Sequence, residues 1–309
     1  MKSWISTNKY ESYKIPLQPQ STRNLRYALN PNLESGRRPQ VPVKFSSYTD
    51  AIYSQGLVPV KPTQLASISP QTNEFQIKGS HSKITMTPLS DLPIPLTFKD
   101  DMVELIQLDQ DDPAYTAMLP MLGDKSNKYF PQNINDPFLN ALEHLIATKL
   151  GRPFDKVICT RPLIRRVENA GYLSHFHLDF DDLENALGYE GSRLKESFKR
   201  KQIEFTNNPD DFKFEMLNAW GPIQLSPVQN TPLAFVKPNK NGAPFPMDSS
   251  HGGSPMLVVG SELELLYAPN MVFGDLLLFN PFYIPHSAVH RKSAESDRTS
   301  IESRCFFLN

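Results

Sequence analysis

One stretch decides the fold of this chain: Gly274-Asp275-Leu276-Leu277-Leu278-Phe279-Asn280-Pro281-Phe282-Tyr283-Ile284-Pro285-His286-Ser287-Ala288. A glycine opens it, an apolar run follows, and two prolines interrupt the chain before the histidine. A short apolar run between turn residues predicts a buried strand. Similar runs lie at 101–107, 156–160, 161–167, 171–180, 212–220, 233–236, 256–259, 263–267 and 300–308. Many short strands separated by proline and glycine turns predict a mainly β fold, a double-stranded β-helix of the jelly-roll or cupin type with flanking helices.

The segment 136–151 has a different period. Its apolar residues recur every three or four positions, as on one face of a helix. Asp136 can cap the helix, Pro137 suits its first turn and Gly151 suits its end. We therefore predict a helix over 136–150, and we interpret His144 on it as a structural or surface residue rather than a metal ligand.

The first hundred residues differ in composition from the rest. They are rich in Pro, Ser, Gln and Asn and carry short apolar runs such as Ile84-Thr85-Met86. We predict an irregular N-terminal extension over 1–100 that packs on the core, with disorder as the alternative for the first 40 residues. The β-helix domain is expected over 101–309, with a polar, helix-compatible insertion at about 181–210 that forms a lid.

Composition excludes several classes of protein. The 309 residues carry 32 Lys+Arg against 33 Asp+Glu, for a net charge of -1, and no basic stripe indicates a nucleic-acid partner. There is neither a signal-like N-terminus nor an apolar run of about 18 residues, so we expect a soluble, cytoplasmic protein without membrane contact. Cys159 and Cys305 lie in or beside apolar stretches, which favours two buried free thiols over a disulfide.

Three residues form a candidate metal site. His177-Leu178-Asp179 ends an extended segment, and His286 follows the apolar strand quoted above. Two imidazoles and one carboxylate in the order HxD…H match the facial triad, which leaves three coordination positions of a ferrous ion open. Since side chains alternate along a strand, His175 shares the face of His177 and Asp179, and we place it in the core or beside the substrate. His290 is the alternative to His286 as the distal ligand.

The last predicted strand offers a binding site for a keto acid. Arg298, Ser300, Glu302 and Arg304 alternate, so one face presents charged and polar groups inward. Such a face is costly in a core unless the groups are paired or bind an anion. We predict that Arg298 and Ser300 bind the distal carboxylate of 2-oxoglutarate and that Glu302 pairs with Arg304. Arg304 is the alternative cation for 2-oxoglutarate, and two purely structural salt bridges are the alternative for both arginines.

Four segments resemble a known family. They are Asn218-Ala219-Trp220-Gly221-Pro222, Pro232-Leu233-Ala234, Pro285-His286-Ser287-Ala288 and Arg298-Thr299-Ser300-Ile301-Glu302-Ser303-Arg304. Over roughly residues 150 to 309 the chain is similar to the gibberellin-desaturase-like hydroxylase/desaturase family, which includes the cephamycin methoxylation-associated proteins. One departure is His290-Arg291, where the family has an acidic residue and a proline.

The resemblance implies an oxygenase that uses iron(II), 2-oxoglutarate and O₂. It implies a small-molecule substrate, a natural product or amino-acid derivative, which is hydroxylated, desaturated or cyclised, including ring closure of the kainoid-synthase kind. We assign Asn218 to the cofactor site and Trp220 to the substrate site. The rival interpretation is a non-catalytic, cupin-like metal- or ligand-binding protein, and Arg298 separates the two because such a module needs no cation for an oxoacid. An oxygenase acting on protein or nucleic acid is disfavoured by the absence of a basic stripe with aromatics.

Several cations are expected near the mouth of the barrel. They are Arg161, Arg165, Arg166, Lys237 and Lys240. They favour a carboxylated, amino-acid-like substrate, with Arg165 or Arg166 as its partner. Neighbouring residues on a strand face opposite sides, so at most one of these two points into the cavity. The charged run 195–201 is interpreted as a solvated surface rather than a substrate contact.

Overall fold

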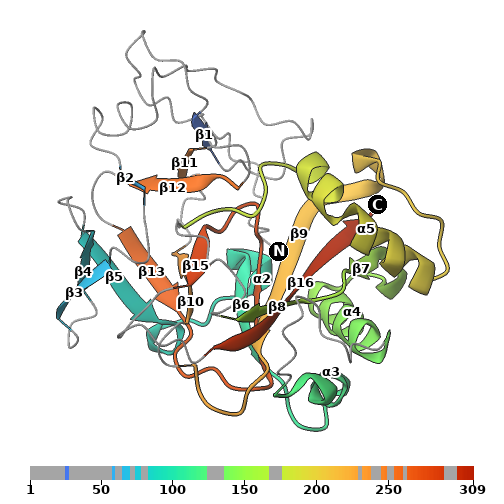
Figure 1. Ribbon diagram of the computed structural model, residues 1–309, viewed down its shortest axis with the longest axis horizontal. Helices are drawn as coiled ribbons and strands as arrows, with labels where there is room; N and C mark the ends of the chain where they lie inside the picture. Colours follow the sequence, from blue (N-terminus) through green and yellow to red (C-terminus); the bar gives the residue numbers. More distant parts are fainter. Residues whose placement is uncertain are drawn as a thin grey trace.

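The computed structural model describes residues 25–27, 58–59, 65–69, 74–77, 83–123, 136–166, 176–228, 232–237, 245–248, 254–259, 263–288 and 298–309 (Figure 1). The α-helices are α2 (Phe98–Asp101), α3 (Pro113–Met118), α4 (Asp136–Leu150) and α5 (Leu183–Arg200). Short 3-10 helices are η2 (Leu89–Asp91), η3 (Leu119–Met121), η4 (Phe154–Lys156) and η5 (Pro209–Asp211).

Strands make up most of the regular structure. In chain order they are β1 (Leu25–Tyr27), β2 (Val58–Pro59), β3 (Leu65–Ser69), β4 (Glu74–Ile77), β5 (Lys83–Pro88), β6 (Val103–Gln107), β7 (Val157–Cys159), β8 (Leu163–Arg166), β9 (Phe212–Pro222), β10 (Leu233–Val236), β11 (Pro246–Asp248), β12 (Met256–Val259), β13 (Leu263–Tyr267), β14 (Asp275–Phe279), β15 (His286–Ala288) and β16 (Thr299–Leu308). The quoted stretch forms β14 and β15, and its opening Gly274 has a φ of +99°, a turn conformation that favours glycine.

Two larger sheets form the body of the molecule. The first sheet has the order β6-β14-β9-β16-β7, with β8 also paired to β16. The second sheet has the order β15-β10-β13-β5-β4-β3, and a third, four-stranded sheet runs β1-β11-β12-β2. Figure 1 shows the second sheet on one side of β9 and β16 and the helices α4 and α5 on the other.

The first sheet separates two hydrophobic cores because successive side chains on its strands point to opposite faces. On the face toward the second sheet, Trp220 and Phe279 join a core that includes Phe235 of β10. On the other face, neighbouring residues of the same strands pack against apolar side chains of α3 and α4, among them Leu142 and Ile146. Polar residues on the inner face of β9 and β16 therefore lie between the two sheets.

The predicted helix is confirmed as α4, which spans Asp136–Leu150 and is followed by Gly151 in a left-handed conformation, φ +60°. The helix-compatible insertion forms α5, whose start is capped by Asp182 accepting from the Asn185 amide. One face of α5 is buried and the other is exposed. Its position as a lid stays a prediction.

The N-terminal extension contributes strands to the sheets. Strand β5, which contains the predicted run Ile84-Thr85-Met86, pairs in parallel with β13, and β3 and β4 continue the second sheet from there. The sequence predicts strands in this segment but not their partners. The domain boundary near residue 100 stays a prediction, and the alternative of disorder in the first 40 residues falls largely outside the described residues.

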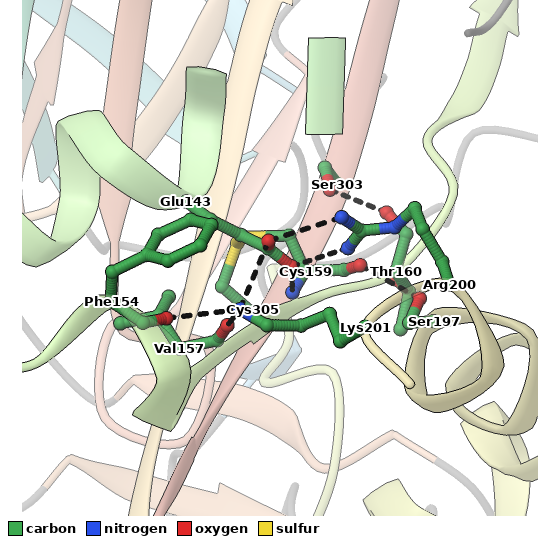
Figure 2. Close-up of a disulfide and its surroundings, with 10 residues drawn as sticks. All are labelled: Glu143, Phe154, Val157, Cys159, Thr160, Ser197, Arg200, Lys201, Ser303 and Cys305. Atoms are coloured by element: carbon green, nitrogen blue, oxygen red, sulfur yellow. Dashed lines mark hydrogen bonds and ion pairs between the residues drawn. A yellow bond between two sulfur atoms is a disulfide. The ribbon is translucent and has the colours of Figure 1, made fainter. Parts of the chain in front are cut away.

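The prediction of two free thiols is wrong, because Cys159 and Cys305 form a disulfide across a sequence separation of 146 (Figure 2). Their burial is as predicted, since both side chains are 0% exposed. The antiparallel pairing of β7 with β16 places Cys159 directly opposite Cys305, so both sulfurs lie on one face of the first sheet. Within the described ranges, no helix has both the length and the apolar character needed to cross a membrane.

Candidate metal centre

The backbone brings the predicted metal ligands together. His177 and His286 form an isolated antiparallel bridge: each amide donates to the carbonyl of the other, over 3.2 and 3.0 Å. The amide of Asp179 donates to the Pro281 carbonyl over 3.1 Å, which fixes the turn that carries the carboxylate. Two segments that are far apart in sequence are thereby held side by side.

The three side chains converge on one point. The ligand atoms of His177, Asp179 and His286 lie within 4.8 Å of one another, and all three residues are buried. Asp179 Oδ1 is 3.6 Å from the Nε2 atom of each histidine. Among the described residues, these three side chains form the group of His, Cys, Asp or Glu that could hold a metal ion.

The ring of His286 is oriented for ligation through Nε2. Its Nδ1 lies 3.0 Å from the Ile284 carbonyl oxygen, which can only accept, so Nδ1 carries the proton and Nε2 keeps its lone pair for a metal. Phe279 flanks the ring at a centroid distance of 4.5 Å. The donor set of two imidazoles and one carboxylate fits a non-haem ferrous ion.

The carboxylate of Asp179 uses its other oxygen for the protein. Oδ2 accepts from Asn218 Nδ2 at 2.7 Å, from Arg304 Nη2 at 3.0 Å and from Arg304 Nε at 3.2 Å. Burial alone would raise the pKa of Asp179, but the charge of Arg304 and the two histidines beside the carboxylate outweigh it and hold this pKa well below its usual value. The carboxylate is therefore ionised and available to a cation.

Arg304 is surrounded by three carboxylates. Besides Asp179, its guanidinium pairs with Glu190 of α5 at 2.6 Å and with Glu302 at 3.1 Å, which confirms the predicted Glu302–Arg304 pair. Burial would lower the pKa of Arg304, but these carboxylates raise it well above its usual value. Phe180 closes one side, with Arg304 Cζ 4.9 Å from its ring centroid. Because these groups already engage the guanidinium, Arg304 is poorly suited to bind a separate carboxylate.

Arg298 immediately precedes β16, the strand that carries Arg304. Its side chain is buried, and Cζ lies 5.3 Å from the ring centroid of Trp220 on β9. Ser300, fully buried, donates to the Arg165 carbonyl oxygen at 3.5 Å. A buried guanidinium on the face that carries the metal site fits the predicted keto-acid site, and the binding of 2-oxoglutarate by Arg298, Ser300 and Asn218 stays a prediction.

The predicted substrate residues are only partly described. Arg165 donates through Nε and Nη2 to Glu302, both at 3.2 Å. Burial would raise the pKa of Glu302, but the charges of Arg165 and Arg304 outweigh it and lower this pKa. Lys237 pairs with Glu264 at 2.7 Å. Outside the described residues or side chains lie Arg166, His175, Lys240, His290 and Arg291. The choice of His286 over His290 therefore rests on the geometry of His286.

Glu190 is the residue of this cluster that the sequence did not single out. It is fully buried, although carboxylates are rarely buried unless they are paired. A signal was present: Glu190 stands three residues after Leu187 and four before Leu194, so helical spacing places it on the apolar face of α5. An acidic residue on that face indicates a buried ion pair.

Comparison with solved structures shows the same fold. A single-substitution variant of the iron and alpha-ketoglutarate-dependent endoperoxidase NvfI has a TM-score of 0.50 and 13% identity over 82% of this chain and 95% of that chain. The endoperoxidase NvfI itself has a TM-score of 0.49 and 14% identity, over 82% of this chain and 96% of that chain. The epimerase SnoN in complex with Fe³⁺, alpha ketoglutarate and nogalamycin RO has a TM-score of 0.36 and 15% identity, over 68% of this chain and 80% of that chain. At this identity the first likeness shows the fold alone, and it confirms the predicted jelly roll.

No protein-family model matches the sequence, and no curated protein matches it either. The resemblance to the gibberellin-desaturase-like family, which was drawn from four short segments, therefore stays a prediction.

Proposed function

We propose that this protein is an Fe(II)- and 2-oxoglutarate-dependent oxygenase that acts on a small molecule, a natural product or amino-acid derivative. One observation carries the proposal: a single oxygen of a buried carboxylate faces the Nε2 atoms of two buried histidines, at 3.6 Å each. Structural zinc sites take four protein ligands, whereas three ligands from this donor set leave positions for a co-substrate and O₂. When bound there, the ferrous ion and 2-oxoglutarate supply the O₂-dependent oxidation that removes hydrogen from a substrate carbon.

The co-substrate is assigned to the inner face of the first sheet. Arg298 supplies a buried, planar cation that can bind a carboxylate through two parallel hydrogen bonds, and Ser300 adds a hydroxyl beside it. Trp220, 1% exposed, packs under the guanidinium and restricts its orientation. These residues bind and orient the co-substrate and exclude water, and the likeness in fold to an iron and alpha-ketoglutarate-dependent enzyme agrees with this assignment.

The finer reaction and the substrate belong to the same proposal. We propose hydroxylation, desaturation or oxidative cyclisation, including ring closure of the kainoid-synthase kind, on a substrate carrying a carboxylate. Of the two arginines proposed to bind that carboxylate, Arg165 has less support because Glu302 already engages it. The segment at about 181–210, which follows the metal ligand Asp179 directly, is proposed as the lid over the substrate.

The alternative is a non-catalytic, cupin-like protein that binds a metal or a small ligand at the same triad. The two proposals differ at Arg298, because only the oxygenase needs a cation for the far carboxylate of a keto acid. The deciding experiment is an anaerobic titration with Fe(II) and then 2-oxoglutarate, followed by absorption spectroscopy. A metal-to-ligand charge-transfer band that needs both components, together with substrate-stimulated succinate formation, supports the oxygenase. Metal binding with no such band supports the binding protein.

A further inference from the structure

We propose that Asn218, Arg304 and Glu190 form a positioning network that presents one oxygen of Asp179 to the metal and links helix α5 to the metal site. The inference rests on the proposed function, because it concerns how the iron site is held. The three residues come from β9, β16 and α5, so three separate elements meet at one carboxylate. None of them is proposed to touch the metal; each acts through Asp179.

The two oxygens of Asp179 have different surroundings. Oδ1 faces the two histidine Nε2 atoms, whereas Oδ2 accepts three N–H groups from Asn218 and Arg304, at 2.7, 3.0 and 3.2 Å. A carboxylate oxygen has about two lone-pair sites, so Oδ2 has no capacity left for a cation. A metal bound at this site would therefore be held by Asp179 through Oδ1 alone. A carboxylate that bound through both oxygens would occupy a position needed by 2-oxoglutarate or O₂.

Arg304 is itself held on every nitrogen. Nε and Nη2 donate to Asp179, Nη2 also pairs with Glu302 at 3.1 Å, and Nη1 donates to Glu190 at 2.6 Å. Glu302 is paired in turn with Arg165 of β8. The guanidinium plane therefore cannot rotate without breaking a buried ion pair, which is strongly destabilising when one partner is left alone.

Glu190 connects this arrangement to α5. Its Oε1 accepts from both Arg304 and Arg193, and within the described residues its Oε2 has no hydrogen-bond partner. A fully buried carboxylate with one unpartnered oxygen is retained at a cost. On the surface of α5 a glutamate would be solvated freely. The burial of Glu190 is explained if this residue holds Arg304 in place, and if Arg304 in turn fixes the orientation of Asp179.

The test uses Co(II) alone, added anaerobically to the full chain without 2-oxoglutarate. Glu190→Gln keeps the size of the side chain and removes its charge; Glu196→Gln makes the same change at an exposed position of the same helix and is the matched control. Asn218→Leu removes a donor to Oδ2 without changing the charge. We measure the Kd for Co(II) and the Co(II) d–d absorption bands, which report the ligand geometry.

For Glu190→Gln we expect about a tenfold weaker Kd, the size typical for a residue that orients a metal ligand, with shifted d–d bands. Asn218→Leu should shift the bands as well, because Asp179 loses its shortest hydrogen bond and the carboxylate can reorient, and Glu196→Gln should match the wild type. Unshifted bands in Glu190→Gln and Asn218→Leu overturn the inference, even if the affinity falls, because loss of charge alone weakens binding without changing geometry. If Glu190→Gln does not fold, Asn218→Leu decides.

Co(II) binding tests the proposed function and the positioning network separately. If the wild-type protein does not bind Co(II), or binds it equally well after His177→Ala, the proposed function fails. If the wild type binds Co(II) through His177 and the variants behave as the control, only the positioning network fails.

Discussion

Helix α5 is held against the rest of the protein by ion pairs at two buried carboxylates, Glu190 and Glu143, and the two sets of ion pairs differ in what they contact. Near its middle, Glu190 pairs with Arg304 and belongs to the network around Asp179. At its end, Arg200 and the following Lys201 pair with the fully buried Glu143 of α4. The first network ends at a carboxylate oxygen that faces two histidines. Among the described residues, the second network contains no such group.

The second network is anchored on backbone groups. As Figure 2 shows, Lys201 donates to the carbonyl oxygens of Phe154 and Val157, at 2.9 and 2.8 Å, and Glu143 accepts from the Cys159 amide at 2.8 Å. The disulfide to Cys305 lies beside it. Burial lowers the pKa of Lys201, although the charge of Glu143 opposes the shift. The buried charges around Glu143 thus contact backbone groups and the end of α5, whereas those around Arg304 contact the carboxylate of the proposed metal site.

The strongest test of this division removes one of the proposed metal ligands. His177→Ala, Asp179→Ala and His286→Ala should each abolish turnover, because each removes one of only three ligands and an incomplete set loses its geometry. The melting temperatures of the two histidine variants should stay close to that of the wild type. The measurement is succinate formation together with thermal unfolding. Wild-type activity in His286→Ala combined with its loss in His290→Ala would show that the distal ligand is His290.

The opposite effect is expected at Glu143. Replacing it with Leu leaves Arg200 and Lys201 buried without their carboxylate and removes the acceptor of the Cys159 amide. Breaking a buried ion pair in this way costs about 3–5 kcal/mol of unfolding free energy. Denaturant unfolding measures the loss, and Co(II) affinity at a temperature where the variant is folded should be unchanged. A variant of full stability, or one with altered Co(II) affinity, would contradict the separation of the two networks.

A somewhat smaller loss should follow from removing the disulfide. Cys159 and Cys305 join β7 to β16 over a long loop, and loss of a native disulfide typically costs about 2–4 kcal/mol, mainly through the entropy of the unfolded chain. Unfolding of the double Cys→Ala variant should begin at lower denaturant, whereas its turnover should be retained. Thiol titration of the unfolded wild-type protein is the direct check, since two reactive thiols without added reductant would mean that the bond does not form.

The sequence was sufficient wherever a local pattern determined the structure. The helical spacing over 136–150, the apolar runs that became β9, β10 and β14, and the order HxD…H each record a repeat or a spacing along the chain. The three metal-site residues were selected in this way, and the structure brings their ligand atoms together.

Long-range pairing set the limit of sequence-based prediction. The parallel pairing of β5 with β13 and the register that sets Cys159 against Cys305 depend on which strands become neighbours, and no local pattern encodes this. The role of Glu190 was hidden for the same reason, because its partner Arg304 lies 114 positions away. The sequence singled out Arg304 and paired it with Glu302, but it did not reveal that Asp179 lies beside its guanidinium.

The smallest expected effect distinguishes the roles of two arginines, Arg298 just before β16 and Arg304 within it. Arg298→Ala should raise the KM for 2-oxoglutarate at least about tenfold, because a charge-assisted contact is worth about 1.5–3 kcal/mol. Arg298→Lys should recover only part of this, because an ammonium cannot form the two parallel hydrogen bonds of a guanidinium. Co(II) affinity should change little in either variant, since Arg298 is assigned to the co-substrate and not to the metal. Arg304→Ala should do the reverse: it should alter Co(II) binding first and the KM for 2-oxoglutarate only as a consequence. If Arg304→Ala raised KM more than Arg298→Ala while Co(II) binding stayed intact, the two arginines would have exchanged roles, and the network around Asp179 would belong to the co-substrate.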